Sequence, residues 1–157
     1  MFGALPEIKV TFRILGARRF ATMKKAAAAR KNGPGKILVI EDNADSRDIL
    51  SKLLRMSGYD VQSASDGESG YSAAKKLVPD LIITDINMPG IDGIELLKRV
   101  RGERALANTA ILVVTAFGGE AAREAVDAGA DAAAAKPFDF DTFIETVQGL
   151  ISNPRKH

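Results

Sequence analysis

From residue 36 onward, short apolar runs alternate with segments whose apolar residues have helical spacing. Apolar or alternating runs predict strands at 36–40, 59–64, 80–85, 110–115 and 132–135. Apolar residues three and four positions apart predict helices at 44–57, 67–77, 92–102, 119–128 and 139–151. Strands and helices therefore alternate, which predicts an α/β domain with a five-stranded parallel sheet and helices on both faces.

The strand predicted at 132–135 consists of four alanines, which favour a helix by intrinsic propensity. We assign a strand because Gly129 ends the preceding helix and because Lys136 and Pro137 follow at once. A family resemblance given below also favours a strand here, whereas periodicity alone does not. The peptide bond before Pro137 is a candidate for the cis form, which turns a strand end sharply.

Residues 1–35 differ from the rest of the chain. They carry eight Lys or Arg and one acid, a net charge of +7, whereas residues 36–157 carry fourteen Lys or Arg and nineteen acids, a net charge of −5. Apolar and polar residues alternate over 8–14, as in a half-buried strand, and 17–31 could form a short basic helix. Two interpretations stay open. The extension is disordered or precedes the natural start, or it adds an edge strand or an arm that joins two copies as a homodimer.

Length and composition limit the class of protein. The 157 residues suffice for one domain, predicted at 36–152, with the basic extension before it and a short tail at 153–157. The sequence contains no cysteine, which excludes disulfides and thiolate metal sites. No apolar stretch is long enough to span a membrane and the N-terminus lacks the pattern of a secretory signal, so we expect a soluble, cytoplasmic protein.

Polar side chains lie at the C-terminal ends of four of the five predicted strands. Glu41 and Asp42 follow the first strand, and Asp85 ends the third. Thr115 ends the fourth strand and Lys136 follows the fifth. The carboxyl ends of parallel strands meet in one crevice of an open α/β sheet, where ligands bind. Carboxylates, a hydroxyl and an ammonium group at this place predict a site for a divalent cation and a phosphoryl group.

The chemistry of these groups suggests a role for each. Glu41 and Asp42 offer hard oxygen ligands, for which Mg²⁺ is the obvious cation. Asp85 could attack phosphorus to form an acyl phosphate, whose oxygens Lys136 and Thr115 could then bind. Taken singly, each residue has a plainer interpretation: the acids could cap a helix or form a turn, Thr115 could lie in the core, and Lys136 could be a solvated charge.

The strand-end motifs together resemble the receiver domain of two-component response regulators, in particular stand-alone receivers of the chemotaxis type. The resemblance covers about residues 36–151. The motifs are KILVIEDN at 36–43, PDLIITDINMPGIDG at 79–93, VVTA at 113–116, GAD at 129–131 and KPF at 136–138. Each motif alone is weak evidence, but their order and spacing together are very specific.

The resemblance implies a fold and a phosphorylation site. The family fold is flavodoxin-like, with a parallel sheet in the strand order 2-1-3-4-5. Asp85 matches the phosphoacceptor of the family. Thr115 and Lys136 match the hydroxyl and the lysine that bind the phosphoryl group.

The resemblance also implies a Mg²⁺ site formed by residues at the ends of the first and third strands. Glu41 and Asp42 match the acidic pair that holds the cation, with Asp42 as the direct ligand. Asp85 contributes its carboxylate, and Asn87 matches the position whose main-chain carbonyl binds the metal. Mg²⁺ is therefore the expected cofactor.

One position departs from the family pattern. Receivers usually carry an aromatic residue in the fifth strand, which moves inward when the threonine shifts toward the phosphoryl group. The matching position here is Ala133, whose methyl group cannot act as a rotameric switch. Coupling could instead run through another group such as Phe117, or the output surface could respond in another way.

The expected function is that of a phosphoacceptor response regulator, not an enzyme. A sensor histidine kinase or a histidine phosphotransfer protein would donate the phosphoryl group. The fourth helix, fifth strand and fifth helix of the domain would then bind a downstream effector protein. The single histidine, His157, excludes a histidine donor role for the chain itself. Few residues follow 151 and the basic extension has no means to read bases, so we expect no sequence-specific DNA binding.

Two alternatives belong to other functional classes. A phosphatase of the haloacid-dehalogenase type would need a second aspartate two residues after the nucleophile, and Asn87 occupies that position. A degenerate receiver would be an interaction module that works without phosphorylation. Ala133 favours that second alternative, whereas Asp85, Thr115 and Lys136 argue against it.

Overall fold

The computed structural model describes residues 33–116 and 119–155. The strand and helix predicted at 8–14 and 17–31, and also Phe117, lie outside the described residues. The strands are β1 (Lys36–Ile40), β2 (Asp60–Ala64), β3 (Leu81–Asp85), β4 (Ala110–Thr115) and β5 (Ala132–Ala135). The helices are α2 (Ala44–Met56), α3 (Gly67–Leu77), α4 (Gly93–Gly102), α5 (Gly119–Asp127) and α6 (Phe140–Ser152).

Each predicted strand and helix of the domain is present, with ends within one residue of the predicted ones. The strand of four alanines is confirmed as β5. A short 3₁₀ helix, η1 (Arg104–Leu106), follows α4 and was not predicted. The Lys136–Pro137 peptide bond is cis, as expected.

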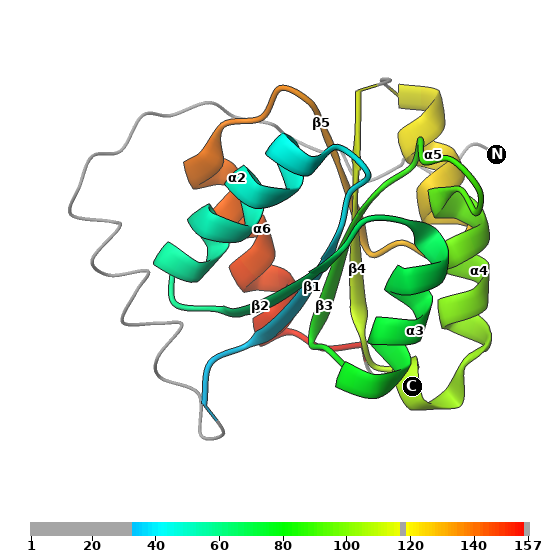
Figure 1. Cartoon of the computed structure of the whole chain (residues 1–157), viewed down its shortest axis with the longest axis horizontal. Helices are drawn as coiled ribbons and strands as arrows, with labels where there is room; N and C mark the ends of the chain where they lie inside the picture. Colours follow the sequence, from blue (N-terminus) through cyan, green and yellow to red (C-terminus); the bar gives the residue numbers. More distant parts are fainter. Residues whose placement is uncertain (1–32, 117–118, 156–157) are drawn as a thin grey trace, which may run out of the picture.

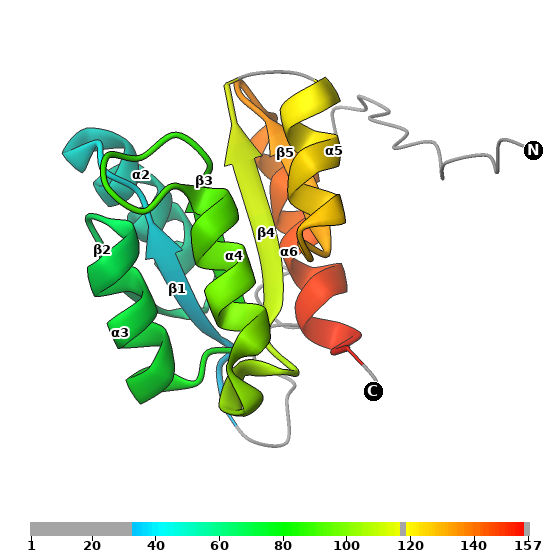
Figure 2. The ribbon, with the colours of Figure 1, turned by 90° about the vertical axis from the view of Figure 1, so that its right-hand side faces the viewer.

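The strands form one parallel sheet in the order β2-β1-β3-β4-β5, which confirms the predicted topology. The helices α2 and α6 cover one face and the helices α3, α4 and α5 cover the other (Figure 1). Figure 2 views the second face, on which α4 lies between α3 and α5. None of the described helices is long and apolar enough to cross a membrane.

Strand residues alternate between two apolar cores because successive side chains point to opposite faces of a sheet. Ile37 and Val39 of β1 pack on the side of α2 and α6. Leu38 and Ile40 pack on the side of α3, α4 and α5. The strands β1, β3 and β4 are buried on both faces, which explains why they appear in the sequence as continuous apolar runs.

Polar side chains fix where the helices begin. Four of them start directly after a residue whose side chain accepts a hydrogen bond from the main-chain N–H three residues later. These N-cap residues are Asn43, Asp66, Asp92 and Asp139. Asn43 lies in the loop after β1, so capping of α2 also shapes the loop that carries the acidic pair.

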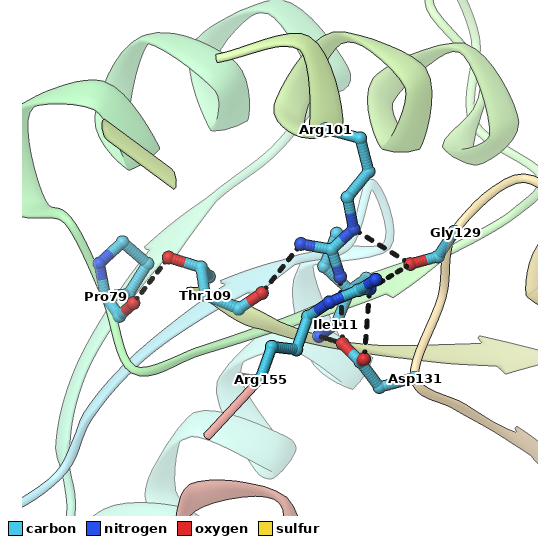
Figure 3. Close-up of polar contacts among 7 residues, drawn as sticks. All are labelled: Pro79, Arg101, Thr109, Ile111, Gly129, Asp131 and Arg155. Atoms are coloured by element: carbon cyan, nitrogen blue, oxygen red, sulfur yellow. Dashed lines mark hydrogen bonds and ion pairs between the residues drawn. The ribbon is translucent and has the colours of Figure 1, made fainter. Parts of the chain in front are cut away.

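A polar network lies at the amino end of the sheet, opposite the predicted site (Figure 3). The Arg101 guanidinium donates to the Thr109 carbonyl at 2.8 Å, to the Gly129 carbonyl at 2.9 Å and to Asp131 Oδ2 at 2.8 Å. Asp131 Oδ2 also accepts the main-chain N–H of Ile111 at 2.8 Å. Burial lowers the pKa of Arg101 from its ordinary value, although the charge of Asp131 acts in the opposite direction. The network ties the end of α4 to the starts of β4 and β5.

Candidate functional site

The predicted site residues lie at the carboxyl ends of the inner strands and of β5. Register brings them together: Asp85 of β3 pairs with Val114 of β4, and Thr115 pairs with Ala135 of β5, directly before Lys136. The main-chain N–H of Lys136 donates to the Thr115 carbonyl at 2.8 Å. The sheet therefore extends its hydrogen-bonding pattern into the site and holds three of the predicted residues in place.

Lys136 joins two of the predicted carboxylates. Its ammonium Nζ lies 2.9 Å from Asp85 Oδ2 and 3.0 Å from Glu41 Oε2. The Glu41 and Asp85 side chains are only 8% and 12% exposed, so the ammonium neutralises charge that water reaches poorly. Burial opposes the charged form of Lys136, but the hydrogen bonds that its ammonium donates to Asp85 and Glu41 outweigh burial and raise the pKa of Lys136 above its ordinary value.

The two oxygens of Asp85 have different partners. Oδ2 faces Lys136, and Oδ1 accepts the main-chain N–H of Asn87 at 2.9 Å. This contact uses the main-chain N–H of Asn87, whereas the family resemblance concerns its carbonyl as a metal ligand, which stays a prediction. The Asn87 side chain is exposed. Both oxygens of Asp85 are thus held in place at the carboxyl end of β3.

The acidic pair divides into a buried and an exposed member. Glu41 is 6% exposed, and its Oε1 accepts the main-chain N–H of Asn43 at 3.1 Å. Asp42 is exposed to solvent. The sequence does not show which acid is buried, because the difference in exposure arises from the way the loop leads into α2.

Thr115 is fully buried at the end of β4. Its main-chain carbonyl contacts Lys136, so the two residues predicted to bind a phosphoryl group are neighbours. Both strand-end residues therefore occupy the side of the site formed by β4 and β5. Asp85 lies next to them on β3.

A cavity of about 480 Å³ opens beside the charged residues, between α2 and the loop after β5. Glu41, Asp85 and Lys136 line one part of it. Apolar side chains line much of the rest, among them Ile49, Leu50, Leu53, Val114, Pro137 and Phe138. The sequence pattern predicted Leu50 and Leu53 as helix residues but did not reveal that they border the site, because the position of α2 over the strand ends is a tertiary feature.

The oxygen donors at the site fit Mg²⁺. Within residues 33–116 and 119–155 no three His, Cys, Asp or Glu side chains are grouped closely enough to form a complete metal cage. Mg²⁺ does not require such a cage, because it retains several waters and is usually bound through one or two carboxylates. Asp85 and the exposed Asp42, together with the main chain at Asn87, would hold the cation, which supplies charge compensation for a phosphoryl group.

The comparison with known families settles the class of the protein. The sequence profile of the response regulator receiver domain matches residues 37–148. The chain belongs to this family. The family places the chain in two-component signal transduction.

Several relatives of this receiver domain are known. The chemotaxis protein CheY-3 of Vibrio cholerae is 39% identical over 120 residues, which cover 73% of this chain and 90% of that protein. The DNA-binding dual master transcriptional regulator RpaA of Synechocystis is 38% identical over 117 residues, which cover 74% of this chain. The matched part spans only 48% of RpaA, about half the length of that relative.

A solved structure relates the fold to the cation. The receiver domain of the sensor histidine kinase PA1611 from Pseudomonas aeruginosa has a TM-score of 0.71 with this chain at 28% identity. The match covers 76% of this chain and 98% of the PA1611 chain. The PA1611 crystal structure contains a magnesium ion coordinated in its active-site cleft. Receiver domains thus bind Mg²⁺ in the active site and act as signalling modules that interact with histidine kinases and effector proteins.

Proposed function

We propose that this receiver domain accepts a phosphoryl group on Asp85 in a Mg²⁺-dependent reaction. The observation that carries the proposal is the contact of Asp85 with Lys136 at 2.9 Å at the mouth of a cavity. Lys136 donates a hydrogen bond to the carboxylate and holds it in place. A carboxylate is a weak nucleophile for a phosphoryl group because both are negative, so charge compensation is the main need of this reaction.

The phosphoryl donor in this proposal is a phosphohistidine of a sensor histidine kinase or a histidine phosphotransfer protein. An Asp85 oxygen forms a bond to phosphorus as the P–N bond breaks, and the imidazole leaves with the bonding electron pair. The product is an acyl phosphate on Asp85. Lys136 and Thr115 then bind its oxygens, and Mg²⁺ held at the site would compensate the negative charge. Glu41, Asp42 and Asn87 complete the site.

The proposed output surface is formed by α5, β5 and α6. Ala133 pairs with Val113 of β4 and packs on the side of α5, where an aromatic residue would otherwise stand. A shift of Thr115 and Lys136 toward the phosphoryl group would move the ends of β4 and β5 directly. The downstream effector would bind this surface, and we propose no sequence-specific DNA contact for the domain.

A small-molecule phosphodonor tests the phosphorylation site. Incubation with radiolabelled acetyl phosphate and Mg²⁺ is expected to label the wild type and Asp80→Asn, but not Asp85→Asn. Asp80 is a suitable control because it lies at the opposite end of the sheet, where it accepts the main-chain N–H of Lys36. Equal labelling of Asp85→Asn and wild type would remove Asp85 as the phosphoacceptor.

A second experiment separates the proposal from a degenerate receiver. Beryllofluoride with Mg²⁺ mimics a phosphoryl group and should shift backbone amide signals in α5, β5 and α6 as well as around Asp85. The same addition to Asp85→Asn should leave the spectrum unchanged. Shifts confined to the loops of the site would favour an interaction module that does not respond to phosphorylation.

A further inference from the structure

Glu41 has a partner for each of its polar atoms. Its main-chain N–H donates to the Ala64 carbonyl at 3.1 Å, and its carboxylate accepts from Asn43 N and from Lys136 Nζ. Its carbonyl oxygen accepts from Arg47 Nη1 at 2.9 Å. The bond from Arg47 differs from the others because Arg47 lies on α2 and not on a strand or loop of the site. The sequence motifs of the site do not include this arginine.

Arg47 holds the peptide that leads to Asp42. The carbonyl of Glu41 belongs to the peptide unit joining Glu41 to Asp42, and a guanidinium bonded to that oxygen restricts rotation of the whole planar unit. The main-chain N–H of Arg47 also donates to the Asn43 carbonyl at 3.0 Å. The Asn43 side chain in turn caps α2 at the N–H of Ser46. The loop is therefore fixed on both sides of Asp42.

The backbone of Asp42 is constrained whereas its carboxylate is exposed to solvent. Residues that orient a metal ligand without touching the metal typically change metal affinity 10–100-fold when removed. The geometry points to Arg47 as a positioning residue for the cation site, through its hydrogen bond to the Glu41 carbonyl. This inference rests on the Mg²⁺ site of the proposed function, with Asp42 as a ligand.

The direction in which the Mg²⁺ affinity changes when Arg47 is replaced distinguishes a positioning role from an effect of its charge. Arg47 is a cation near a site for another cation, so removal of its charge would by itself tighten Mg²⁺ binding. Loss of the hydrogen bond would instead leave the Glu41–Asp42 peptide free to turn and would weaken binding. A weaker affinity after removal of Arg47 thus reports the hydrogen bond and not the charge.

The test is a Mg²⁺ titration of the full chain, followed by calorimetry or by backbone amide shifts. Arg47→Met keeps the aliphatic stem and removes the donor, and it is expected to raise the Kd for Mg²⁺ about tenfold. Arg47→Lys keeps a charged donor and should restore much of the affinity. Arg55→Met is the matched control, because Arg55 of the same helix donates to the Val61 carbonyl at 2.9 Å, away from the site. The Kd of Arg55→Met for Mg²⁺ should equal that of the wild type.

The outcomes separate this inference from the proposed function. A Kd for Arg47→Met equal to or below that of the wild type would overturn the role of Arg47. Equal weakening in Arg47→Met and Arg55→Met would also overturn it, since the effect would then come from general loss of stability. Asp42→Asn and Asp85→Asn should both lose Mg²⁺ binding, and retention of binding in both would instead reject the cation site on which the inference depends.

Discussion

At the scale of single residues, one ammonium group compensates two poorly hydrated carboxylates. Lys136 contacts Asp85 and Glu41 at hydrogen-bond distance, and its pKa is raised in the folded protein. The strand-end position of Lys136 predicted a phosphate partner. The structure adds that the same group balances the two acids without phosphate, which explains how a crowded acidic site is compatible with a stable fold.

The raised pKa of Lys136 has a consequence for stability at high pH. The folded state binds this proton more tightly than the unfolded state, where a lysine has a pKa of about 10.4. The stabilisation is therefore fully present below about pH 10.4 and is lost as the pH rises through the higher pKa of the folded state. Urea denaturation from pH 9 to 11.5 should show a steeper loss of stability in the wild type than in Lys136→Met. Parallel curves would contradict the ion-pair role.

Two buried serines of α2 and its C-cap provide a matched pair for a stability test. Ser51 is 2% exposed, and its hydroxyl has no hydrogen-bond partner among the described residues. Ser57 is 4% exposed and donates from Oγ to the Leu53 carbonyl at 2.9 Å. Burial of an unpaired hydroxyl costs about 1–3 kcal/mol, whereas a paired one contributes about 0.5–1.5 kcal/mol.

Ser51→Ala is therefore expected to leave the free energy of unfolding unchanged or to raise it by about 1 kcal/mol. Ser57→Ala should lower it by about 0.5–1 kcal/mol. Urea denaturation at neutral pH measures both. A loss of stability in Ser51→Ala as large as that in Ser57→Ala would contradict the prediction that the Ser51 hydroxyl is unpaired.

At the scale of elements, close backbone contacts decide how β3 connects to α4. Gly93 begins α4, and a Cβ there would lie 2.5 Å from the Asp85 carbonyl oxygen and 2.8 Å from Ile86 Cα. Both neighbours are backbone atoms that cannot rotate away. Gly102 ends the same helix, and a Cβ there would meet nothing within 4 Å. Only Gly93 is therefore required by close packing, although both glycines lie at ends of the same helix.

Gly93→Ala should lower the free energy of unfolding by about 1–3 kcal/mol, as expected when a side chain is overpacked against backbone atoms that cannot move away. It should also reduce labelling by acetyl phosphate, because the clash falls on the backbone of the phosphoacceptor. Gly102→Ala is expected to raise stability by about 0.4–1 kcal/mol by restricting the unfolded chain. Chemical denaturation and the labelling assay test the pair. Equal effects of the two substitutions would contradict the predicted contact.

The elements themselves were largely predictable because their apolar periodicity is local. Strands buried on both faces give continuous apolar runs, and N-cap residues and glycines mark helix ends, so predicted ends agree with the structure to within one residue. The strand β5 was predictable only from its flanking residues and from the family resemblance, because four alanines contain no periodic signal. The 3₁₀ helix η1 was missed, since three residues are too few to show a period.

At the scale of the whole molecule, the two ends of the sheet have different polar chemistry. The carboxyl end brings Glu41, Asp85 and Lys136 together beside a cavity. The amino end brings together Arg101 and Asp131, whose hydrogen-bonding groups are directed at the protein itself. The sequence predicted the first cluster because parallel strands must converge. It did not predict the second, because its members come from helix ends and turns without a repeating pattern.

The amino-end network also holds the segment that follows α6. Arg155 Nη1 lies 3.1 Å from Asp131 Oδ1 and 3.2 Å from the Gly129 carbonyl (Figure 3). Asp131 is the shared acceptor, with a side chain that is 18% exposed, whereas the Arg155 side chain is 37% exposed. Removal of the Asp131 carboxylate leaves Arg101 half-buried without its ion pair. Removal of the Arg155 guanidinium leaves the rest of the network intact.

Asp131→Ala is therefore expected to lower the free energy of unfolding by about 2 kcal/mol, less than for a fully buried pair because water reaches the site. Arg155→Ala should cost no more than about 0.5–1 kcal/mol, as for other exposed ion pairs. Asp127→Ala, an exposed acid of α5, is the control and should change stability by less than about 0.5 kcal/mol. Urea denaturation at low and high salt measures the free energy of unfolding of all three variants.

Because Asp131 lies at the far end of the sheet from Asp85, acetyl phosphate labelling should persist in Asp131→Ala. Loss of labelling would show that the amino-end network also shapes the phosphorylation site.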